Sequence, residues 1–290
     1  LITGLNSSNQ SIANLYANDG SGNYSLVTGT PFDGFWQGSI AFADSDNDSD
    51  LDVLITGYNS SNQPIAMLYV NDGTGNYSLV TGTPFDGVYV SSIAFGDIDN
   101  DSDLDVLITG NNSSNQRIAK LYTNDGSGNY SLVTGTPFDG VWRGSIAFED
   151  IDNDNDLDIL ISGLNSSNQP IANLYTNDGS GNYSLVTGTP FDGVYVSSIA
   201  FGDIDNDSDL DVLITGYNSS FQRIAKLYTN DGFGNYALVT GTPFDDVQSG
   251  SIAFGDIDND SDKDVLITGL NSSNQSIANL YANDGSGNYS

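Results

Sequence analysis

The chain contains no cysteine and no histidine, and it has few basic residues. Its 290 residues include 6 Lys and Arg against 38 Asp and Glu, for a formal net charge of −32 at pH 7. Without cysteine, no disulfide stabilises the fold and none indicates a redox compartment. The usual histidine base and thiol nucleophile of enzymes are also absent, and no isolated pair of acids suggests glycoside hydrolysis. We therefore expect no catalytic residues and a protein that is not an enzyme.

The excess of negative charge narrows the possible partners. Phosphate backbones and anionic lipid headgroups would repel the chain, so nucleic-acid binding and membrane-surface binding are not expected. No apolar run approaches the roughly 18 residues that a membrane-spanning helix needs, and we expect no membrane insertion. The charge instead suits polycations, multivalent metal ions or a saline medium.

The chain contains a sequence unit that is repeated five times. A run rich in aspartate begins at five positions, each 53 residues after the last: Asp44, Asp97, Asp150, Asp203 and Asp256. Residues 1–25 and 266–290 are the same string, "LITGLNSSNQSIANLYANDGSGNYS", offset by five periods. Because the chain opens in the middle of a repeat, we expect a processed product or a window of a longer protein.

Each unit reads as four short strands. In the second copy these are "SSIAFGD" (91–97), "DVLITG" (105–110), "RIAKLYT" (117–123) and "YSLVTGTPF" (130–138), separated by polar or glycine-rich turns. No segment has the 3.6-residue periodicity of a helix. An all-β class is predicted, with the 53-residue units as four-stranded antiparallel blades of a β-propeller; an open solenoid is the rival.

The repeats predict a single repeat domain over 1–290. It would comprise a partial blade at 1–38, repeats starting near 39, 92, 145 and 198, and a final partial repeat at 251–290. Because the second and third strands occur six times and the others fewer, two arrangements stay open. The blades close as a propeller, for example with five blades, or the chain is a window of a longer repeat array.

The aspartate run suggests a metal loop. In "DIDNDSDLD" (97–105) carboxylates occupy positions 1, 3, 5, 7 and 9. Calcium takes about 6–8 oxygens, which side chains at 1, 3, 5 and 9 and a carbonyl near 7 can supply in part. The run is not an EF-hand, because position 6 is Ser or Asn, position 12 is Ile, and strands flank it. The alternative, without a bound metal, is a solvated acidic turn of a salt-adapted protein.

The runs and their surroundings resemble the FG-GAP/VCBS repeat, which builds calcium-binding β-propellers in integrin α-subunits, propeller lectins and bacterial surface proteins. The resemblance rests on "FGDIDND" in register with "NDGSGNY". It implies about five Ca²⁺, one per loop, with Asn at position 4 and Ser or Asn at position 6 departing from the family's glycines. In the fifth loop Lys263 replaces leucine. The implied ligands are Asp44, Asp46, Asp48, Asp52, Asp97, Asp99, Asp101, Asp105, Asp150, Asp152, Asp154, Asp158, Asp203, Asp205, Asp207, Asp211, Asp256, Asp258, Asp260 and Asp264.

The copies differ most in the connection that precedes each 91–97-type strand. One position there carries an aromatic ring in four copies and glutamine in the fifth, and Arg143 follows one ring. Exposed rings at that place would stack on sugars, whereas the alternative is packing between blades. The candidate ligand-binding residues are Trp36, Tyr89, Trp142, Arg143, Tyr195 and Gln248.

The polar hairpin tips carry N-x-S sequons, which are glycosylation acceptors or ordinary Asn/Ser turns. The acceptors would be Asn6, Asn59, Asn112, Asn165, Asn218 and Asn271. Together, the residues and the resemblance predict a non-enzymatic, calcium-stabilised extracellular or cell-surface propeller for adhesion or recognition. Its partners would be glycans or other cell-surface or matrix molecules, with self-association through identical repeats. The alternative is a structural subunit or segment of an extracellular filament or surface array.

Overall fold

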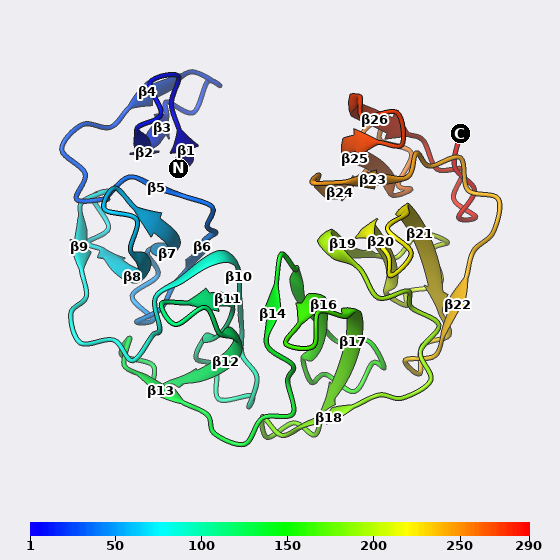
Figure 1. Ribbon diagram of the computed structural model, residues 1–290, viewed down its shortest axis with the longest axis horizontal. Coiled ribbons are helices and arrows are strands. Elements are labelled where there is room, and N and C mark those ends of the chain that lie inside the picture. Colours follow the sequence, from blue (N-terminus) through cyan, green and yellow to red (C-terminus); the bar gives the residue numbers. More distant parts are fainter. The chain divides into compact units, whose positions relative to one another are not determined.

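The computed structural model describes all residues from 1 to 290, and every regular element in it is a β-strand, which confirms the predicted all-β class (Figure 1). None of the elements is a helix able to cross a membrane. The chain divides into two compact units: unit 1 holds residues 1–97 and 101–135, and unit 2 holds residues 98–100 and 136–290.

The main element of each repeat is a long antiparallel hairpin. In the four hairpins from β7 to β21, the first strand starts at the last aspartate of the run and the second ends at the asparagine of the "ND" that opens the glycine-rich turn. In unit 2, for example, Leu213 lies opposite Leu227 and Ile214 opposite Lys226. The hairpins are β1 (Ile2–Leu5) with β2 (Ser11–Asn14), β7 (Asp52–Asn59) with β8 (Pro64–Asn71), β11 (Asp105–Asn112) with β12 (Arg117–Asn124), β16 (Asp158–Asn165) with β17 (Pro170–Asn177), β20 (Asp211–Tyr217) with β21 (Arg223–Asn230), and β25 (Asp264–Asn271) with β26 (Ser276–Tyr281).

An inner strand flanks each complete hairpin on one side. It is continuous in β10 (Val88–Gly96) and β19 (Tyr195–Gly202). Even there the register shifts, between Tyr89 and Ser92 in β10 and between Tyr195 and Ser198 in β19. In the other copies the strand is split into a two-residue and a four-residue piece. The pieces are β5 (Phe35–Trp36) and β6 (Ile40–Ala43), β14 (Val141–Trp142) and β15 (Ile146–Glu149), and β23 (Val247–Gln248) and β24 (Ile252–Gly255).

The outer strand is shorter than the sequence predicts. Where residues 130–138 were expected, β13 covers only Tyr130–Leu132. The positive φ of Gly135 turns the chain, and Pro137 has no N–H to donate, so the ladder stops. The other outer strands are β4 (Tyr24–Leu26), β9 (Tyr77–Leu79), β18 (Tyr183–Leu185) and β22 (Tyr236–Leu238). Of these, β4 pairs with the short strand β3 (Tyr16–Asn18).

The "LITG" glycine permits the inner strand to approach the hairpin closely. Gly216 has φ +143°, and a Cβ there would lie 2.9 Å from the carbonyl oxygen of Tyr195. Any larger residue would push the inner strand away. The glycine therefore belongs to the packing of the blade and not to a turn.

Blades pack face to face within each unit, so successive residues of one strand enter different cores. In β20, Val212 and Ile214 join a core with Leu160 and Leu174 of the preceding blade. Leu213, between them, packs with Val265 and Ile267 of the following blade. This two-sided burial explains the continuous apolar run of "DVLITG", because strands covered on both faces do not alternate with polar residues.

We name the two sides of a blade by their largest residues. The Leu face is Ile204, Leu213 and Leu227, and it meets the Tyr face of the next blade, which is Val265, Ile267 and Tyr281. The same pairing occurs in unit 1, where Leu54 and Leu68 pack with Val106, Ile108 and Tyr122. Each fully buried leucine contributes roughly 1.5–3 kcal/mol to folding, so the faces are the main source of stability.

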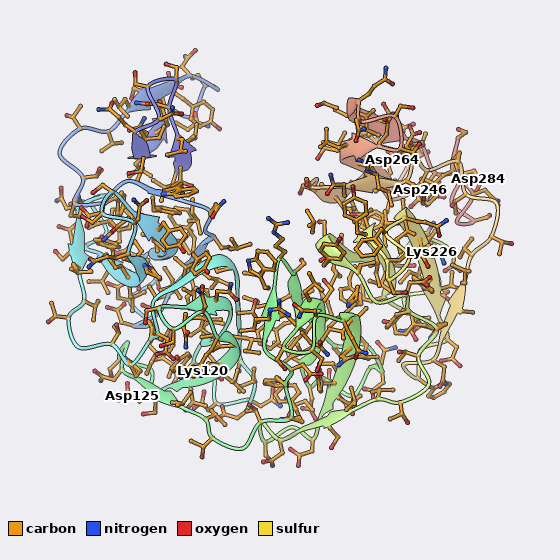
Figure 2. The ribbon with its side chains drawn as sticks, in the orientation of Figure 1. Lys120, Asp125, Lys226, Asp246, Asp264 and Asp284 are labelled. Carbon is orange, nitrogen blue, oxygen red and sulfur yellow. The ribbon has the colours of Figure 1, made fainter.

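Ion pairs add little to this packing. Lys120 pairs with Asp86 and Lys226 with Asp192, in each case between a hairpin strand and the connection that leads into the inner strand of the same blade. Figure 2 labels the two lysines. All four side chains are about one third exposed, so each pair contributes at most about 1 kcal/mol. Acidic residues outnumber basic ones 38 to 6, so most of the negative charge must be solvated or bound by other ions.

Candidate metal centre and aromatic groove

Each aspartate run forms the corner between an inner strand and the hairpin. In the third copy, the run lies between β15 and β16. The Asp150 carboxylate accepts hydrogen bonds from the backbone N–H groups of Asp154 (3.1 Å) and Asn155 (3.0 Å). The Asp154 carboxylate in turn accepts one from the N–H of Asp156 at 3.0 Å. The first aspartate therefore closes the loop locally, before any tertiary contact.

Positions 4 and 6 of the loop adopt the left-handed conformation. Asn153 has φ 60° and Asn155 φ 71°, and the corresponding residues of the other loops have similar values. Asparagine tolerates this region through its short polar side chain. Serine at position 6, as in Ser208 with φ 75°, is less suited to it.

The loops bring carboxylate oxygens together. In three of them the oxygens of positions 1, 3 and 5 lie within 4.8 Å of one another: Asp44, Asp46 and Asp48; Asp150, Asp152 and Asp154; Asp256, Asp258 and Asp260. In the fourth loop the cluster is Asp203, Asp205 and Asp211. Since Ca–O distances are about 2.3–2.6 Å, oxygens on opposite sides of one calcium ion lie about 5 Å apart, so this spacing fits a shared ion. In the second loop Asp97, Asp101 and Asp105 belong to unit 1 and Asp99 to unit 2.

The third position of the run gives the clearest indication that the loop suits a cation. The Oδ1 atoms of Asp46, Asp152 and Asp205 are buried and accept no hydrogen bond from any protein donor. Burial raises the pKa of each of these carboxyls, and the neighbouring aspartates raise it further. A buried, unsatisfied carboxylate oxygen is costly unless a positive charge meets it. The donor set is all oxygen, as calcium prefers.

The ninth position is more structural than the sequence suggests. Asp158 is buried, and its two oxygens accept the backbone N–H groups of Ile151 (3.3 Å) and Asn177 (2.8 Å). Asp52 and Asp264 use their oxygens in the same way, and only Asp211 also belongs to a cluster. Burial raises the pKa of Asp158 and of Asp211 to about 7. This residue ties the loop to the hairpin, and its role as a direct ligand stays a prediction.

The candidate ligand-binding rings of unit 1 lie on the inner strands and stack in a row. The Trp36 ring packs on Tyr58 at a centroid distance of 5.3 Å, and Tyr58 stacks on Tyr89 at 4.2 Å. Tyr89 also donates a hydrogen bond to the side chain of Asn115. Packing between rings of neighbouring blades therefore accounts for part of their burial.

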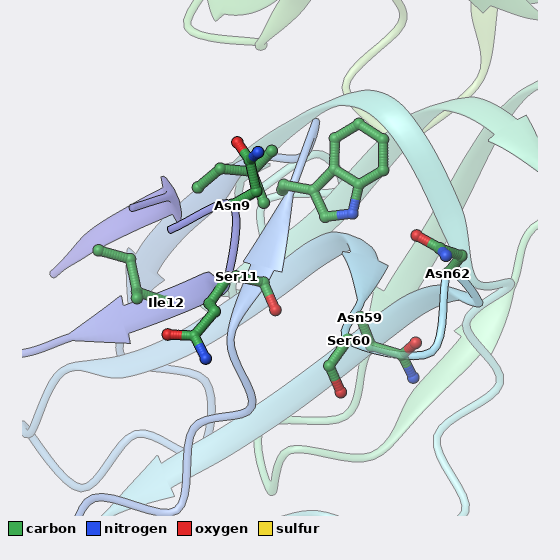
Figure 3. Close-up of a pocket in the computed structure, with 9 residues that line it drawn as sticks. Asn9, Ser11, Ile12, Asn59, Ser60 and Asn62 are labelled. Carbon is green, nitrogen blue, oxygen red and sulfur yellow. The ribbon is translucent and has the colours of Figure 1, made fainter. Parts of the chain in front are cut away.

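Trp36 additionally lines a groove that the sequence does not predict (Figure 3). The groove has a volume of about 610 Å³ and lies between the tips of the first two hairpins. Apart from the ring, it is lined mainly by amides and hydroxyls, from Asn9, Gln10, Ser11, Asn59, Ser60 and Asn62. The nearest sequence signal was the polar composition of the tips, which carries no information about which tips meet.

The corresponding residues of unit 2 are arranged differently. Arg143 lies over the ring of Trp142, 4.3 Å from its centroid. Tyr195 packs on Tyr217 at 5.5 Å, and Gln248 accepts a hydrogen bond from the Ser249 hydroxyl at 3.1 Å. Arg143 is thus engaged with its neighbouring ring. Its backbone carbonyl also accepts the N–H of Val196 (2.7 Å), whose carbonyl accepts the N–H of Ser249 (3.2 Å), so the backbone links these three connections.

The side chains of the sequon asparagines stabilise the hairpin tips by hydrogen bonds. The Asn218 side-chain oxygen accepts the backbone N–H groups of Ser220 (2.9 Å) and Gln222 (3.0 Å). The same two bonds form at Asn6, Asn59, Asn112, Asn165 and Asn271. Turn chemistry therefore accounts for the residues, and glycosylation stays a prediction.

Comparison with known proteins places the chain by its repeats. A family model described as an FG-GAP-like repeat matches residues 46–108, 97–161 and 203–267. The comparison with curated protein sequences found no match.

Similar solved structures include an exo-beta-1,3-galactanase from Phanerochaete chrysosporium with galactose, at 14% identity and a TM-score of 0.42. They also include the V. cholerae biofilm matrix protein Bap1, at 15% identity and a TM-score of 0.48. The matches cover 88% and 89% of this chain, which spans 66% of the galactanase chain and 39% of the Bap1 chain.

Proposed function

This chain belongs to the FG-GAP-like repeat family, and on that premise we propose that it is a non-enzymatic, calcium-stabilised scaffold. It would act outside the cell or at its surface in adhesion or recognition, with glycans as the ligand class. Recurring clusters of three carboxylates, with a buried and unsatisfied oxygen at the third position, carry the calcium part of the proposal. Extracellular calcium concentrations suit modules that bind this ion at about 10⁻⁴–10⁻³ M.

Bound calcium would neutralise carboxylates that otherwise repel one another inside each loop. Asp150, Asp152 and Asp154 would hold it in the third loop. Asp158, which accepts the N–H groups of Ile151 and of Asn177, would tie the loop to β17. Five ions, each of charge +2, would change the formal net charge from −32 to −22. The loops would then hold the blade corners rigid and leave recognition to other surfaces.

Thermal unfolding with and without calcium tests this part. An ion present at about 100 times its Kd stabilises the folded state by about 2.7 kcal/mol per site. Several such sites should raise the melting temperature by more than about 10 °C over the chelated protein. The control replaces calcium with sodium chloride of equal ionic strength. If sodium chloride restores the same melting temperature, general screening of negative charge explains the effect and the metal loops are rejected.

The groove at Trp36 is the best candidate for glycan recognition. A half-buried indole beside amides and hydroxyls offers a stacking surface together with hydrogen-bond donors and acceptors, which is the chemistry that sugars require. A glycan array with calcium present would identify ligands. Trp36→Ala should then weaken binding at least tenfold, while Phe233→Ala, which removes an exposed ring elsewhere, should leave it unchanged. Absence of binding across broad panels would remove this part of the proposal.

A second candidate function is structural: a subunit or segment of an extracellular filament or surface array. The observation that favours it is a pair of uncovered faces. The Leu face of the last blade, Ile257, Leu266 and Leu280, is 52%, 39% and 51% exposed. On the first hairpin, Ile2, Tyr16 and Tyr24 of the Tyr face are exposed as well. These faces match those that pack together inside each unit, so a further repeat would cover them.

Electron microscopy of native material distinguishes the two candidates. Long filaments with a period that matches these repeats would favour the structural role. Discrete discs that bind glycans would favour recognition. Light scattering of the purified chain adds a quantitative readout, because head-to-tail packing of complementary faces gives open-ended association that grows with concentration.

A further inference from the structure

In the first four metal loops, the asparagine at position 4 reaches the loop of the next blade. The Nδ2 of Asn153, in the third loop, donates to Oδ1 of Asp209, at position 7 of the fourth, over 2.9 Å. The same contact recurs at every described junction of this type: Asn47 to Asp103 (2.6 Å), Asn100 to Asp156 (2.7 Å) and Asn206 to Asp262 (2.8 Å). Successive loops are therefore joined by a charge-assisted hydrogen bond.

The accepting aspartate is itself fixed against its own loop. The N–H of Asp209 donates to Oδ1 of Asp207, one of the predicted calcium ligands, at 3.0 Å. On its other side, the Asp209 carboxylate lies over Gly232, where a Cβ would come within 2.6 Å of it. Two contacts thus connect Asn153 in one loop with a ligand in the next.

A second, buried link runs parallel to the first. The Nδ2 of Asn230 donates to the carbonyl oxygen of Ile151, at position 2 of the third loop, over 2.7 Å. The backbone N–H of Asn230 donates to Oδ1 of Asp211, at position 9 of the fourth loop, over 2.8 Å. The conformation of the third loop therefore affects two carboxylates of the fourth loop. It reaches Asp209 through Asn153, and Asp211 through Asn230.

The position-4 link depends on the asparagine side chain. Glycine would satisfy the left-handed backbone there equally well, but it has no side chain to reach the next blade. Asparagine satisfies both requirements, because it tolerates φ near 60° and presents an amide donor. Position 6 has the same backbone conformation, and at Asn155 no side-chain contact of this kind accompanies it.

We propose that the position-4 asparagines couple neighbouring calcium loops, so that calcium bound by one loop raises the affinity of the next. This rests on the proposed calcium binding. An ion orders the third loop and thereby fixes Asn153, which holds Asp209 in place; the fourth loop then loses less conformational freedom when it binds its own ion. Asn153 is a positioning residue, since it contacts no predicted ligand directly. The coupling is reciprocal, as binding linkage requires.

Hydrogen exchange measured by mass spectrometry during a calcium titration tests the coupling. Residues 97–110 and 203–216 have the same sequence, but the next residue is Asn111 in the second repeat and Tyr217 in the fourth. Peptides that cover 203–217 therefore report on the fourth loop alone. The third loop is disabled by Asp152→Asn with Asp154→Asn. This double substitution is made in the natural chain, in Asn153→Gly and in the matched control Asn155→Gly. The quantity measured is the calcium concentration that gives half-maximal protection of the fourth loop.

In the natural chain, disabling the third loop should raise that concentration about fivefold, within the tenfold that a charge-assisted hydrogen bond of about 1.5 kcal/mol allows. In Asn153→Gly the increase should be less than about twofold, and in Asn155→Gly it should again be about fivefold. Long-range effects of the lost charges occur in all three backgrounds and cancel. Asp209→Asn keeps the shape of the side chain but removes its charge. In that variant, disabling the third loop should also raise the calcium concentration by less than in the natural chain.

Equal increases in all three backgrounds would overturn the coupling while leaving calcium binding intact. If calcium protects no loop of the natural chain, both the coupling and the proposed calcium binding fail. A fivefold increase in Asn153→Gly would likewise overturn the assignment to this residue, because the remaining link through Asn230 would then suffice.

Discussion

The fourth repeat and the last blade have nearly the same sequence but different surroundings. Leu213 is fully buried between two blades, whereas the equivalent Leu266 is 39% exposed. Ile204 and Leu227 are buried in the same way, and their equivalents Ile257 and Leu280 are about half exposed. Nearly identical strands therefore have a core on two sides or on one, depending on whether another blade packs against them. In this fold, the burial of a side chain depends on the junction between two blades and not on the sequence of the repeat.

The metal loops show the same contrast. In the third loop Asp150 and Asp152 are half-buried, because the glycine-rich turn of the following blade, at Gly234, lies against Ile151 and Asp152. In the fifth loop Asp256, Asp258 and Asp260 are all exposed. The unsatisfied buried oxygen found at Asp152 has no counterpart at Asp258. A neighbouring blade thus dehydrates a loop and makes it a stronger candidate for cation binding.

The largest effect should come from the Leu face. Leu213→Ala removes a side chain that two blades enclose, and such substitutions cost about 2–5 kcal/mol. Leu266→Ala, the same change on the uncovered face, should cost less than about 1 kcal/mol, because water already contacts that side chain. Urea unfolding of both variants in calcium measures the difference. Equal losses would mean that the last blade's face is covered in solution, as self-association would produce.

Loss of a metal ligand should matter more inside the array than at its end. Asp152→Asn should remove much of the stabilisation by calcium at its loop, about 2–3 kcal/mol at saturating calcium. Asp258→Asn should remove less, since water screens the exposed fifth loop. The measurement is the calcium-dependent rise in melting temperature of each variant. A larger effect at Asp258 would mean that dehydration by a neighbouring blade does not strengthen a loop's hold on calcium.

The pH dependence of the calcium-free protein should reveal the buried ninth position. Burial raises the folded-state pKa of Asp158 and Asp211 to about 7, above the ordinary value near 3.8. Their contribution favours folding most below pH 3.8, and it is lost as pH rises through about 7, because the fold disfavours the charged form. Melting temperature should therefore fall over this interval, and calcium should reduce the fall.

The double variant Asp158→Asn with Asp211→Asn is the control for this pH dependence. It carries neutral side chains of the same shape at both positions, so the calcium-free fall between pH 4 and pH 7 should become shallower. An unchanged slope would show that other carboxyls produce the pH dependence.

The smallest effect concerns the connections before the inner strands. Val196 has φ 51°, a conformation that a β-branched residue adopts only at a cost of about 1–2 kcal/mol. Val196→Asn should therefore raise the free energy of unfolding by about 0.5–1 kcal/mol. The equivalent Ser249 has φ 54° but no branched side chain, so Ser249→Asn should gain less. A loss of stability in Val196→Asn would show that packing of the valine outweighs its backbone strain.

Local patterns determined a large part of this protein without any tertiary information. Repeats of 53 residues, hairpins that start at the ninth position of each run, and clustering of Asp150, Asp152 and Asp154 all follow from contacts between residues close in sequence. Spacing alone specifies such contacts, because a tight loop brings alternate side chains to one side. The outer strand was overestimated, since Gly135 and Pro137 end it early.

Contacts between blades were decided only by the tertiary structure. The sequence contains Asn153 and Asp209 but has no signal that the amide of one meets the carboxylate of the other, 56 residues away. It likewise gives Leu213 and Leu266 the same neighbours along the chain, although only one of them is buried. Repetition determines the shape of a blade, whereas the free energy of each face depends on whether another blade excludes water from it.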